Sequence, residues 1–219
     1  MYLSKLTVNY NLIRARRLLA SPYELHKAIM RAFPDASEGG PGRVLFRVDE
    51  TNEPDRIFIL VQSENEPCWQ KAQHLVSLLA ELPQTKPLQL QFAKGQILYF
   101  RLLANPTVKR KADDNLSSKR LGLLREEDQL AWLKRKAEKG GFSLVSCIPT
   151  AKEMIKDTKD DGATRYKLSL LSVCFEGVLQ VEDPDLLLET VRMGVGSAKG
   201  LGFGLLSLAP IEVRDAHSV

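Results

Sequence analysis

Cysteine and histidine are scarce in this chain of 219 residues, with three of each. The cysteines, Cys68, Cys147 and Cys174, lie far apart without a C-x-x-C pair, and the histidines are equally scattered. A disulfide framework requires organised cysteine spacing, and a zinc site requires clustered cysteine and histidine ligands. The sequence therefore predicts neither of them, and we expect the functional site to use no metal and no cofactor.

Long apolar runs are also missing. No stretch reaches the roughly 18 apolar residues that a membrane-spanning helix requires. The first residues, Met1 to Lys5, already follow a strand-like pattern and lack the apolar segment of a signal peptide. We therefore expect a cytoplasmic protein that binds no membrane and is a monomer on its own.

Positive charge is in mild excess, since 31 lysines and arginines against 27 aspartates and glutamates give a net charge of +4. This excess alone is equally typical of a solvated surface. The basic residues cluster along the sequence, at 14–17, 109–111, 119–120 and 134–136. On one face of the molecule, such clusters would attract a phosphate backbone.

The hydrophobic pattern predicts the element order βαββαβ twice. In the first half, strands are expected at 2–10, 42–50, 56–64 and 88–93, and helices at 21–33 and 68–80. In the second half, strands are expected at 96–104, 142–148, 166–181 and 204–209, and helices at 125–139 and 184–192. Two charged segments resist this pattern: a loop is expected at 107–124, and a loop tip or hairpin at 149–165. The order predicts an α+β protein of two tandem ferredoxin-like domains, 1–94 and 95–219.

The helix at 21–33 has the clearest start, with Ser21 as N-cap and Pro22 at its first position. Its periodicity places His26 at the edge of the apolar face, with Tyr23 one turn earlier on the same side. His26 can donate or accept a proton near neutral pH, and Tyr23 can hydrogen-bond a phosphate oxygen. A histidine in this position is more often a packing residue, so periodicity alone leaves both interpretations open.

An RNA substrate would suit this helix. RNA carries its own nucleophile, the 2′-hydroxyl beside the scissile phosphate, and each well-placed acid or base accelerates its attack by roughly 10²–10⁴-fold. Lys27 and Arg31, spaced i, i+4, could hold the phosphate and neutralise developing charge. No metal is needed for such a reaction.

Glycine is concentrated at residues 194–210, GVGSAKGLGFGLLSLAP. The segment is not a dinucleotide fingerprint, because Lys199 stands where the third glycine should be, and it lacks the Gly-Lys-Ser/Thr of a P-loop. Two interpretations stay open: a structural turn between helix and strand, or a cradle for an RNA phosphate. The candidate contacts of such a cradle are Gly196, Ser197, Lys199 and Gly200.

Six stretches, in this order, together resemble one family: MYLSKL, SPYELHKAIMRAFP, YFRLLANPTVKRK, QLAWLKRKAEKGGF, VCFEGVLQV and GVGSAKGLGFGLLSLAP. The chain resembles, from residue 1 to about 210, the CRISPR-associated repeat-processing endoribonuclease of type I-E (CasE) systems. The resemblance implies two ferredoxin-like domains of the repeat-associated RNA-binding superfamily. It also implies metal-independent cleavage of CRISPR precursor RNA at the base of the repeat stem-loop, with 5′-hydroxyl and 2′,3′-cyclic phosphate ends. Such enzymes typically keep the mature guide RNA and join the other Cascade subunits.

The family's histidine and tyrosine fall on His26 and Tyr23, which are thereby expected to be catalytic. The remaining expected RNA contacts are basic side chains on the same helix and in the two charged segments: Lys27, Arg31, Lys109, Arg110, Lys156, Lys159 and Arg165. One departure is that the family's R-x-R-A-N-P has no basic residue at Leu103 here, which puts any RNA contact there in doubt.

Two alternatives remain. A non-catalytic RNA-binding subunit of the same superfamily would use His26 only for packing. A small-molecule enzyme of ferredoxin-like fold would need a nucleotide fingerprint or clustered metal ligands, and the sequence has neither.

Overall fold

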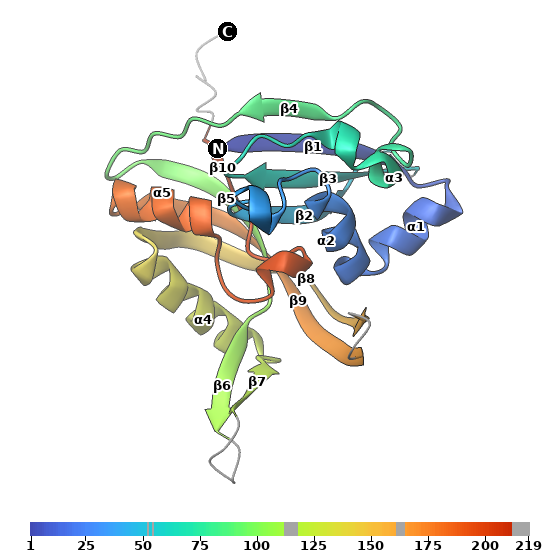
Figure 1. The fold of residues 1–219 in the computed structure, drawn as a ribbon. Coiled ribbons are helices and arrows are strands. Elements are labelled where there is room, and N and C mark those ends of the chain that lie inside the picture. Colours follow the sequence, from blue (N-terminus) through green and yellow to red (C-terminus); the bar gives the residue numbers. More distant parts are fainter. Residues whose placement is uncertain (52, 54, 112–117, 161–164, 212–219) are drawn as a thin grey trace, which may run out of the picture.

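In the computed structural model of the chain, two four-stranded antiparallel sheets lie against each other (Figure 1). The structure describes residues 1–51, 53, 55–111, 118–160 and 165–211. Each sheet has the strand order of a ferredoxin-like βαββαβ unit, so the predicted α+β fold class is confirmed. No helix in these ranges combines the length and apolar character needed to cross a bilayer.

The N-terminal sheet has the order β2-β3-β1-β4, from β1 (Tyr2–Asn9), β2 (Val44–Glu50), β3 (Arg56–Ser63) and β4 (Gln84–Pro87). Its helices are α1 (Ile13–Leu19), α2 (Pro22–Met30) and α3 (Gln73–Val76), with 3-10 turns η1 (Ala36–Glu38) and η2 (Trp69–Lys71). Helix α2 buries Leu25, Ala28 and Ile29 in the core of this half. The Ser21 hydroxyl accepts a hydrogen bond from the Glu24 N–H, which confirms the predicted cap.

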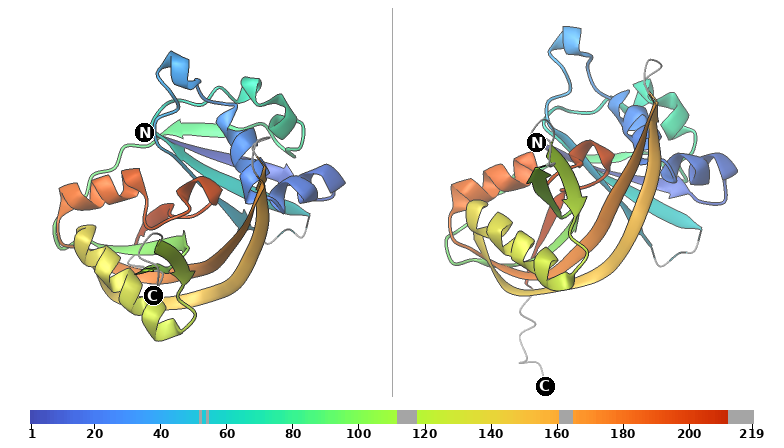
Figure 2. Two further views of the ribbon diagram at one scale, coloured as in Figure 1. Left: turned by 60° about the horizontal axis from the view of Figure 1, so that its bottom comes forward. Right: turned by 90° about the horizontal axis from the view of Figure 1, so that it is seen from below.

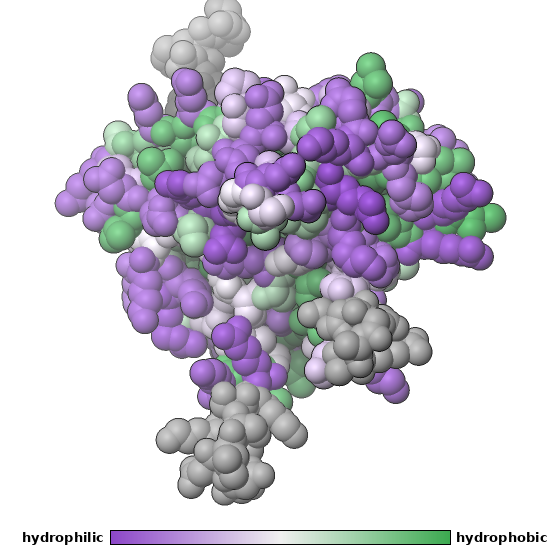
Figure 3. All heavy atoms as spheres, in the orientation of Figure 1, coloured by the Kyte–Doolittle hydropathy of each residue, from purple (hydrophilic) through white to green (hydrophobic). Residues whose placement is uncertain are grey.

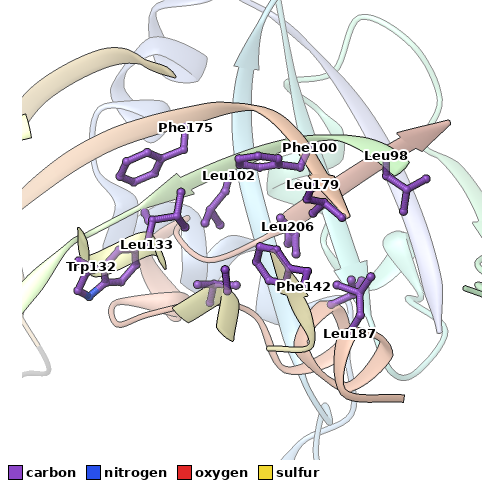
Figure 4. Packing of buried hydrophobic residues seen from close by; sticks show 14 of the residues in the cluster. Leu98, Phe100, Leu102, Trp132, Leu133, Phe142, Phe175, Leu179, Leu187 and Leu206 are labelled. Carbon is purple, nitrogen blue, oxygen red and sulfur yellow. The ribbon is translucent and has the colours of Figure 1, made fainter. Parts of the chain in front are cut away.

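The C-terminal sheet has the order β10-β5-β9-β8, from β5 (Ile97–Ala104), β8 (Phe142–Asp160), β9 (Arg165–Val181) and β10 (Leu206–Pro210). Its apolar face packs under α4 (Glu126–Lys139) and α5 (Pro184–Met193), around Phe142, Phe175, Trp132 and Leu133 (Figure 4). The glycine-rich loop, residues 194–204, follows α5 and contains the 3-10 turn η3 (Lys199–Leu201).

Two hairpins project from the C-terminal half. The first pairs β6 (Thr107–Lys111) with β7 (Ser118–Gly122). The second, called the arm below, is the continuation of β8 and β9 beyond the sheet at residues 153–160 and 165–172. Two register shifts in β8 precede the arm, and such bulges bend a strand. The arm accordingly curves from the C-terminal sheet towards α2 (Figure 2).

Buried polar contacts join the two halves. The Arg47 Nε lies 2.8 Å from the Asp49 Oδ1, and both side chains are at most 5% exposed. From β2, the Arg47 Nη1 also donates to the Leu205 carbonyl and to the Ser207 hydroxyl in the C-terminal half. Arg101 reaches the Asp49 carboxylate from β5 at 3.4 Å. This network fixes the glycine-rich loop, which precedes β10, relative to the N-terminal sheet.

Several predicted elements were wrong. The segment 107–124 is not a loop, since it contains the β6–β7 hairpin. For the charged segment 149–165, the expected hairpin is confirmed, because β8 continues to Asp160 and pairs there with β9, which begins at Arg165. The predicted strand 88–93 is absent from the described structure, and β4 pairs with β1 instead. The predicted helix 68–80 is reduced to η2 and α3, and α1 was not predicted. The division of the chain at residues 94 and 95 stays a prediction.

Candidate active site and nucleic-acid interface

His26 lies half-buried on α2, between the N-terminal sheet and the glycine-rich loop. Its ring stacks on Phe46, with 6.5 Å between ring centroids and 17° between planes. Burial lowers the pKa of His26 below its ordinary value, because desolvation disfavours the charged imidazolium. The neutral imidazole is therefore the dominant form at neutral pH, and this form can accept a proton.

The glycine-rich loop forms the other side of the His26 site. A Cβ atom placed on Gly200 would lie only 3.5 Å from the His26 Cε1, so the loop backbone packs directly over the imidazole. Gly194 has a φ of +77°, and a Cβ there would approach Leu45 to 2.8 Å. Glycine is required at 194, because other residues rarely adopt this conformation.

Tyr23 and Lys27 share α2 with His26, and Arg31 is the C-cap of this helix, but their environments differ. The Lys27 Nζ lies 5.3 Å from the centre of the Tyr23 ring and forms an ion pair of 2.9 Å with Glu24. The hydrogen bond to Glu24 raises the pKa of Lys27. Arg31 is exposed at the C-terminal end of the helix. Of these two cations, Lys27 is thus partly neutralised by Glu24.

The arm meets α2 at its first turn through Asp157. Its carboxylate accepts hydrogen bonds from the Ser21 hydroxyl at 3.0 Å and from the Tyr23 backbone N–H at 2.9 Å. A carboxylate is favourable here, because the first N–H groups of a helix lack partners within the helix. The arm and the helix that carries His26 are therefore fastened together.

Lys199 is turned inwards. Its Nζ donates to the Met193 carbonyl at 2.8 Å, and so braces the glycine-rich loop against the end of α5. Burial lowers the pKa of Lys199, and the nearby positive charges of Arg43 and Lys136 lower it further. The predicted contact of Lys199 with RNA therefore competes with a structural hydrogen bond.

A small cavity of about 220 Å³ lies where the β6–β7 hairpin, α4 and the glycine-rich loop meet. We call it the cationic pocket, and it is lined by Thr107, Lys109, Arg120, Trp132, Lys136, Gly196 and Ser197. Among the described residues its lining includes three cations and no acidic side chain. Unneutralised cations beside hydroxyl and backbone groups are suited to a phosphate.

The predicted site residues thus fall into three groups. His26 and Gly200 are in contact, with Tyr23 and Lys27 on the same helix, whereas Lys109, Gly196 and Ser197 line the cationic pocket. Lys156 is exposed on the arm. The strands also hold Arg110, Lys159 and Arg165, whose side chains lie outside the described part of the structure.

Sequence reasoning missed Asp157, Arg120 and Lys136 as site residues. Arg120 and Lys136 belong to basic clusters that the sequence does show, but their shared pocket depends on the packing of a hairpin against a helix. Asp157 is 134 residues from Tyr23, in a segment whose predicted contacts were all basic. No local pattern predicts a contact of that range.

Comparison with known proteins places the chain in a family. A family model described as CRISPR associated protein matches residues 1–210. The CRISPR-associated endoribonuclease Cse3 of Thermus thermophilus is 38% identical, over 96% of this chain and all of the relative. The Cascade subunit CasE of Escherichia coli is 33% identical over the same shares.

A solved structure of Thermus thermophilus Cse3, bound to an RNA representing a pre-cleavage complex, has the same fold. Its TM-score is 0.81 at 35% identity, over 95% of this chain and 98% of that chain. The matches cover both ferredoxin-like units and the glycine-rich loop. This chain therefore belongs to the family of CRISPR-associated endoribonucleases that includes Cse3 and CasE.

Proposed function

We propose that this protein cleaves CRISPR precursor RNA within its repeats, at the base of the stem-loop, and retains the mature guide RNA. The observation that carries the proposal is the placement of His26, a half-buried imidazole between Phe46 and the backbone of Gly200. The helix also bears Tyr23 and Lys27, and Arg31 follows its last residue. Membership of an endoribonuclease family supports the same activity.

In the proposed mechanism His26 acts as a general base. The neutral imidazole takes the proton of the 2′-hydroxyl, whose oxygen attacks the adjacent phosphorus, while the bond from phosphorus to the 5′-oxygen breaks. The leaving 5′-oxygen takes up a proton from water, so the products carry a 2′,3′-cyclic phosphate and a 5′-hydroxyl. Lys27, Arg31 and the Tyr23 hydroxyl would stabilise the negative charge that develops on the phosphate. The 2′-hydroxyl is the nucleophile, so no metal-bound water is required.

The RNA stem would lie across the face between the two hairpins and the glycine-rich loop. Lys109, Arg110, Gly196 and Ser197 would hold it on one side, and Lys156, Lys159 and Arg165 on the arm would hold it on the other. Gly200 and Lys199 would contribute to RNA binding indirectly, because they shape the glycine-rich loop. When one phosphate contact is removed, the slope of the logarithm of the binding constant against the logarithm of the salt concentration should decrease in magnitude by about one.

The proposed partners are the repeat RNA and the other Cascade subunits. Cse3 has been solved with RNA, and the relative CasE is named as a Cascade subunit. The cytoplasmic location and the monomeric state of the free protein stay predictions.

The test uses a repeat stem-loop RNA, excess EDTA, and analysis of both product ends. We expect cleavage with a cyclic phosphate end, and none when the nucleotide 5′ of the junction carries a 2′-deoxy sugar. Cleavage of the deoxy substrate would contradict the mechanism. Tight binding of the all-ribose RNA without cleavage would support the non-catalytic RNA-binding subunit instead.

A further inference from the structure

A larger cavity, of about 670 Å³, lies beside the cationic pocket, between the β6–β7 hairpin and the arm. The glycine-rich loop closes it through Ser197 and Ala198, and Asn105 lies in its lining. Ligand sites for small molecules typically occupy about 300–1,000 Å³. The cavity is therefore large enough for a nucleobase with its sugar, and the proposed active site does not use it.

The walls of this cavity are mostly apolar and partly open to solvent. Leu121 and Leu124 line it from the side of the hairpin, and Met154 from the arm, with exposed fractions of 44%, 62% and 51%. Apolar surface also shows between the two hairpins in Figure 3, on a face that is otherwise largely hydrophilic. Apolar side chains gathered around a concave surface are typical of a binding site.

Asn105 adds a polar feature to this apolar lining. The residue is only 6% exposed, and its Oδ1 has no hydrogen-bond partner in the described part of the chain. A buried acceptor without a partner costs free energy. A turn of this side chain towards the cavity would let an N–H donor of a ligand remove that cost, and asparagine side chains are well suited to the edges of nucleobases.

The cavity and the cationic pocket share a wall. Thr107, Arg120 and Ser197 line both of them. The largely apolar cavity therefore continues directly into a site suited to a phosphate. A nucleotide has this combination of groups, whereas an apolar protein segment would leave the cations of the second pocket without a counter-charge.

We propose that this cavity takes one unstacked nucleobase of the RNA substrate, with an adjoining phosphate in the cationic pocket. This inference rests on the proposed function, since it concerns the same RNA. A base within a duplex is stacked and paired, so the occupant is an unpaired nucleotide of the stem-loop or its flanks. The base would be held by burial of its faces against the apolar walls and by the guanidinium plane of Arg120, on which a base can stack.

The experiment is an abasic scan. Each unpaired nucleotide of the cleavage substrate is replaced in turn by an abasic site, and binding to the full-length protein is measured. We expect one position to weaken binding by about tenfold, because the base loses its burial against the apolar walls. A scan in which no position weakens binding would overturn the proposal, while cleavage of the intact RNA in the same preparation would show that the proposed function stands.

Two variants assign that position to the cavity. Met154→Ala removes an apolar wall, and Ser169→Trp places a ring in the cavity from the exposed side of β9. Both variants should bind the intact RNA more weakly than the wild type does. They should bind the RNA that is abasic at this position with the same affinity as the wild type. If removal of the base weakened RNA binding by both variants as much as by the wild type, the assignment would be contradicted. Leu82→Ala, at a residue 83% exposed outside this cavity, is the matched control, and it should keep the wild-type penalty.

Discussion

The Asp157 carboxylate accepts a hydrogen bond of 2.9 Å from the backbone N–H of Tyr23. It joins the arm of the C-terminal half to the helix that carries His26, and the Ser21 hydroxyl strengthens the connection through the same carboxylate. Residues of the arm and of α2 that would face the same RNA are thus held at a fixed spacing before RNA arrives.

Asp157→Ala should release the arm from α2. We expect the free energy of unfolding to fall by about 1–2 kcal/mol, because a helix loses a carboxylate at its first turn. The cleavage rate should fall as well, since Tyr23 and the arm lose their common anchor. Asp183→Ala is the matched control: Asp183 caps α5 through the N–H groups of Asp185 and Leu186. A similar loss of stability without loss of cleavage is expected there, and equal cleavage by both variants would contradict a role for Asp157.

Substitutions in the glycine-rich loop should separate folding from chemistry. Gly194→Ala forces a side chain into a left-handed backbone and against Leu45, so we expect it to destabilise the fold by about 1–3 kcal/mol. In Gly200→Ala the added Cβ atom would lie at ordinary contact distances from the His26 ring, so the free energy of unfolding should change by less than about 0.5 kcal/mol. Gly200→Val should keep the fold but displace the His26 ring and slow cleavage. Thermal unfolding and single-turnover rates measure both effects, and full activity of Gly200→Val would be the contrary result.

Loss of the buried pair of Arg47 and Asp49 should lower the free energy of unfolding far more than loss of an exposed pair does. Asp49→Ala leaves the Arg47 guanidinium buried without its carboxylate, and such a loss costs about 3–5 kcal/mol. Glu24→Ala breaks the exposed pair with Lys27 and should leave the free energy of unfolding nearly unchanged, because exposed ion pairs are screened by solvent. Urea denaturation compares the two variants. A similar cost for both would show that the contact between the halves does not depend on this network.

The lowered pKa of His26 predicts how stability depends on pH. The folded protein binds a proton at this site less readily than the unfolded chain does, whose histidine pKa is about 6.5. The contribution of His26 to stability is therefore complete above pH 6.5 and decreases as the pH falls through that value towards the folded pKa. Relative to His26→Gln, the wild type should lose stability between pH 8 and pH 5. A difference that stays constant or grows on acidification would contradict the burial of the imidazole.

The features that the sequence predicts well are local. Ser21 and Pro22 mark the start of α2, because capping depends on residues that are neighbours in the sequence. The burial of Leu25, Ala28 and Ile29 confirms the face of the helix that their spacing predicts to be buried. Helix α1 escaped prediction because its N-cap, Leu12, makes no side-chain cap and only Ala15 is buried. The alternation at 88–93 predicted a strand, but Leu90 and Phe92 pack against the C-terminal core outside any sheet.

The parts of the candidate site that could not be predicted depend on contacts between distant segments. The first strand of the arm has charged residues on both faces, so it lacks the alternation by which a half-buried strand is recognised. The cationic pocket needs Arg120 from a hairpin and Lys136 from a helix to converge. His26 was predicted from its helix and its motif, but its contacts with Phe46 and Gly200 come from segments up to 174 residues away along the chain.

The central claim is that His26 performs proton transfer in RNA cleavage, and a pair of histidine variants tests it most directly. His74 is exposed on α3 and makes no ring contact among the described residues, so His74→Ala is a matched control. Single-turnover cleavage of the repeat stem-loop is measured in EDTA, together with RNA binding. The account predicts that His26→Ala lowers the rate by at least about 100-fold with binding nearly unchanged, and that His74→Ala cleaves like the wild type. Cleavage by His26→Ala at the wild-type rate would contradict it.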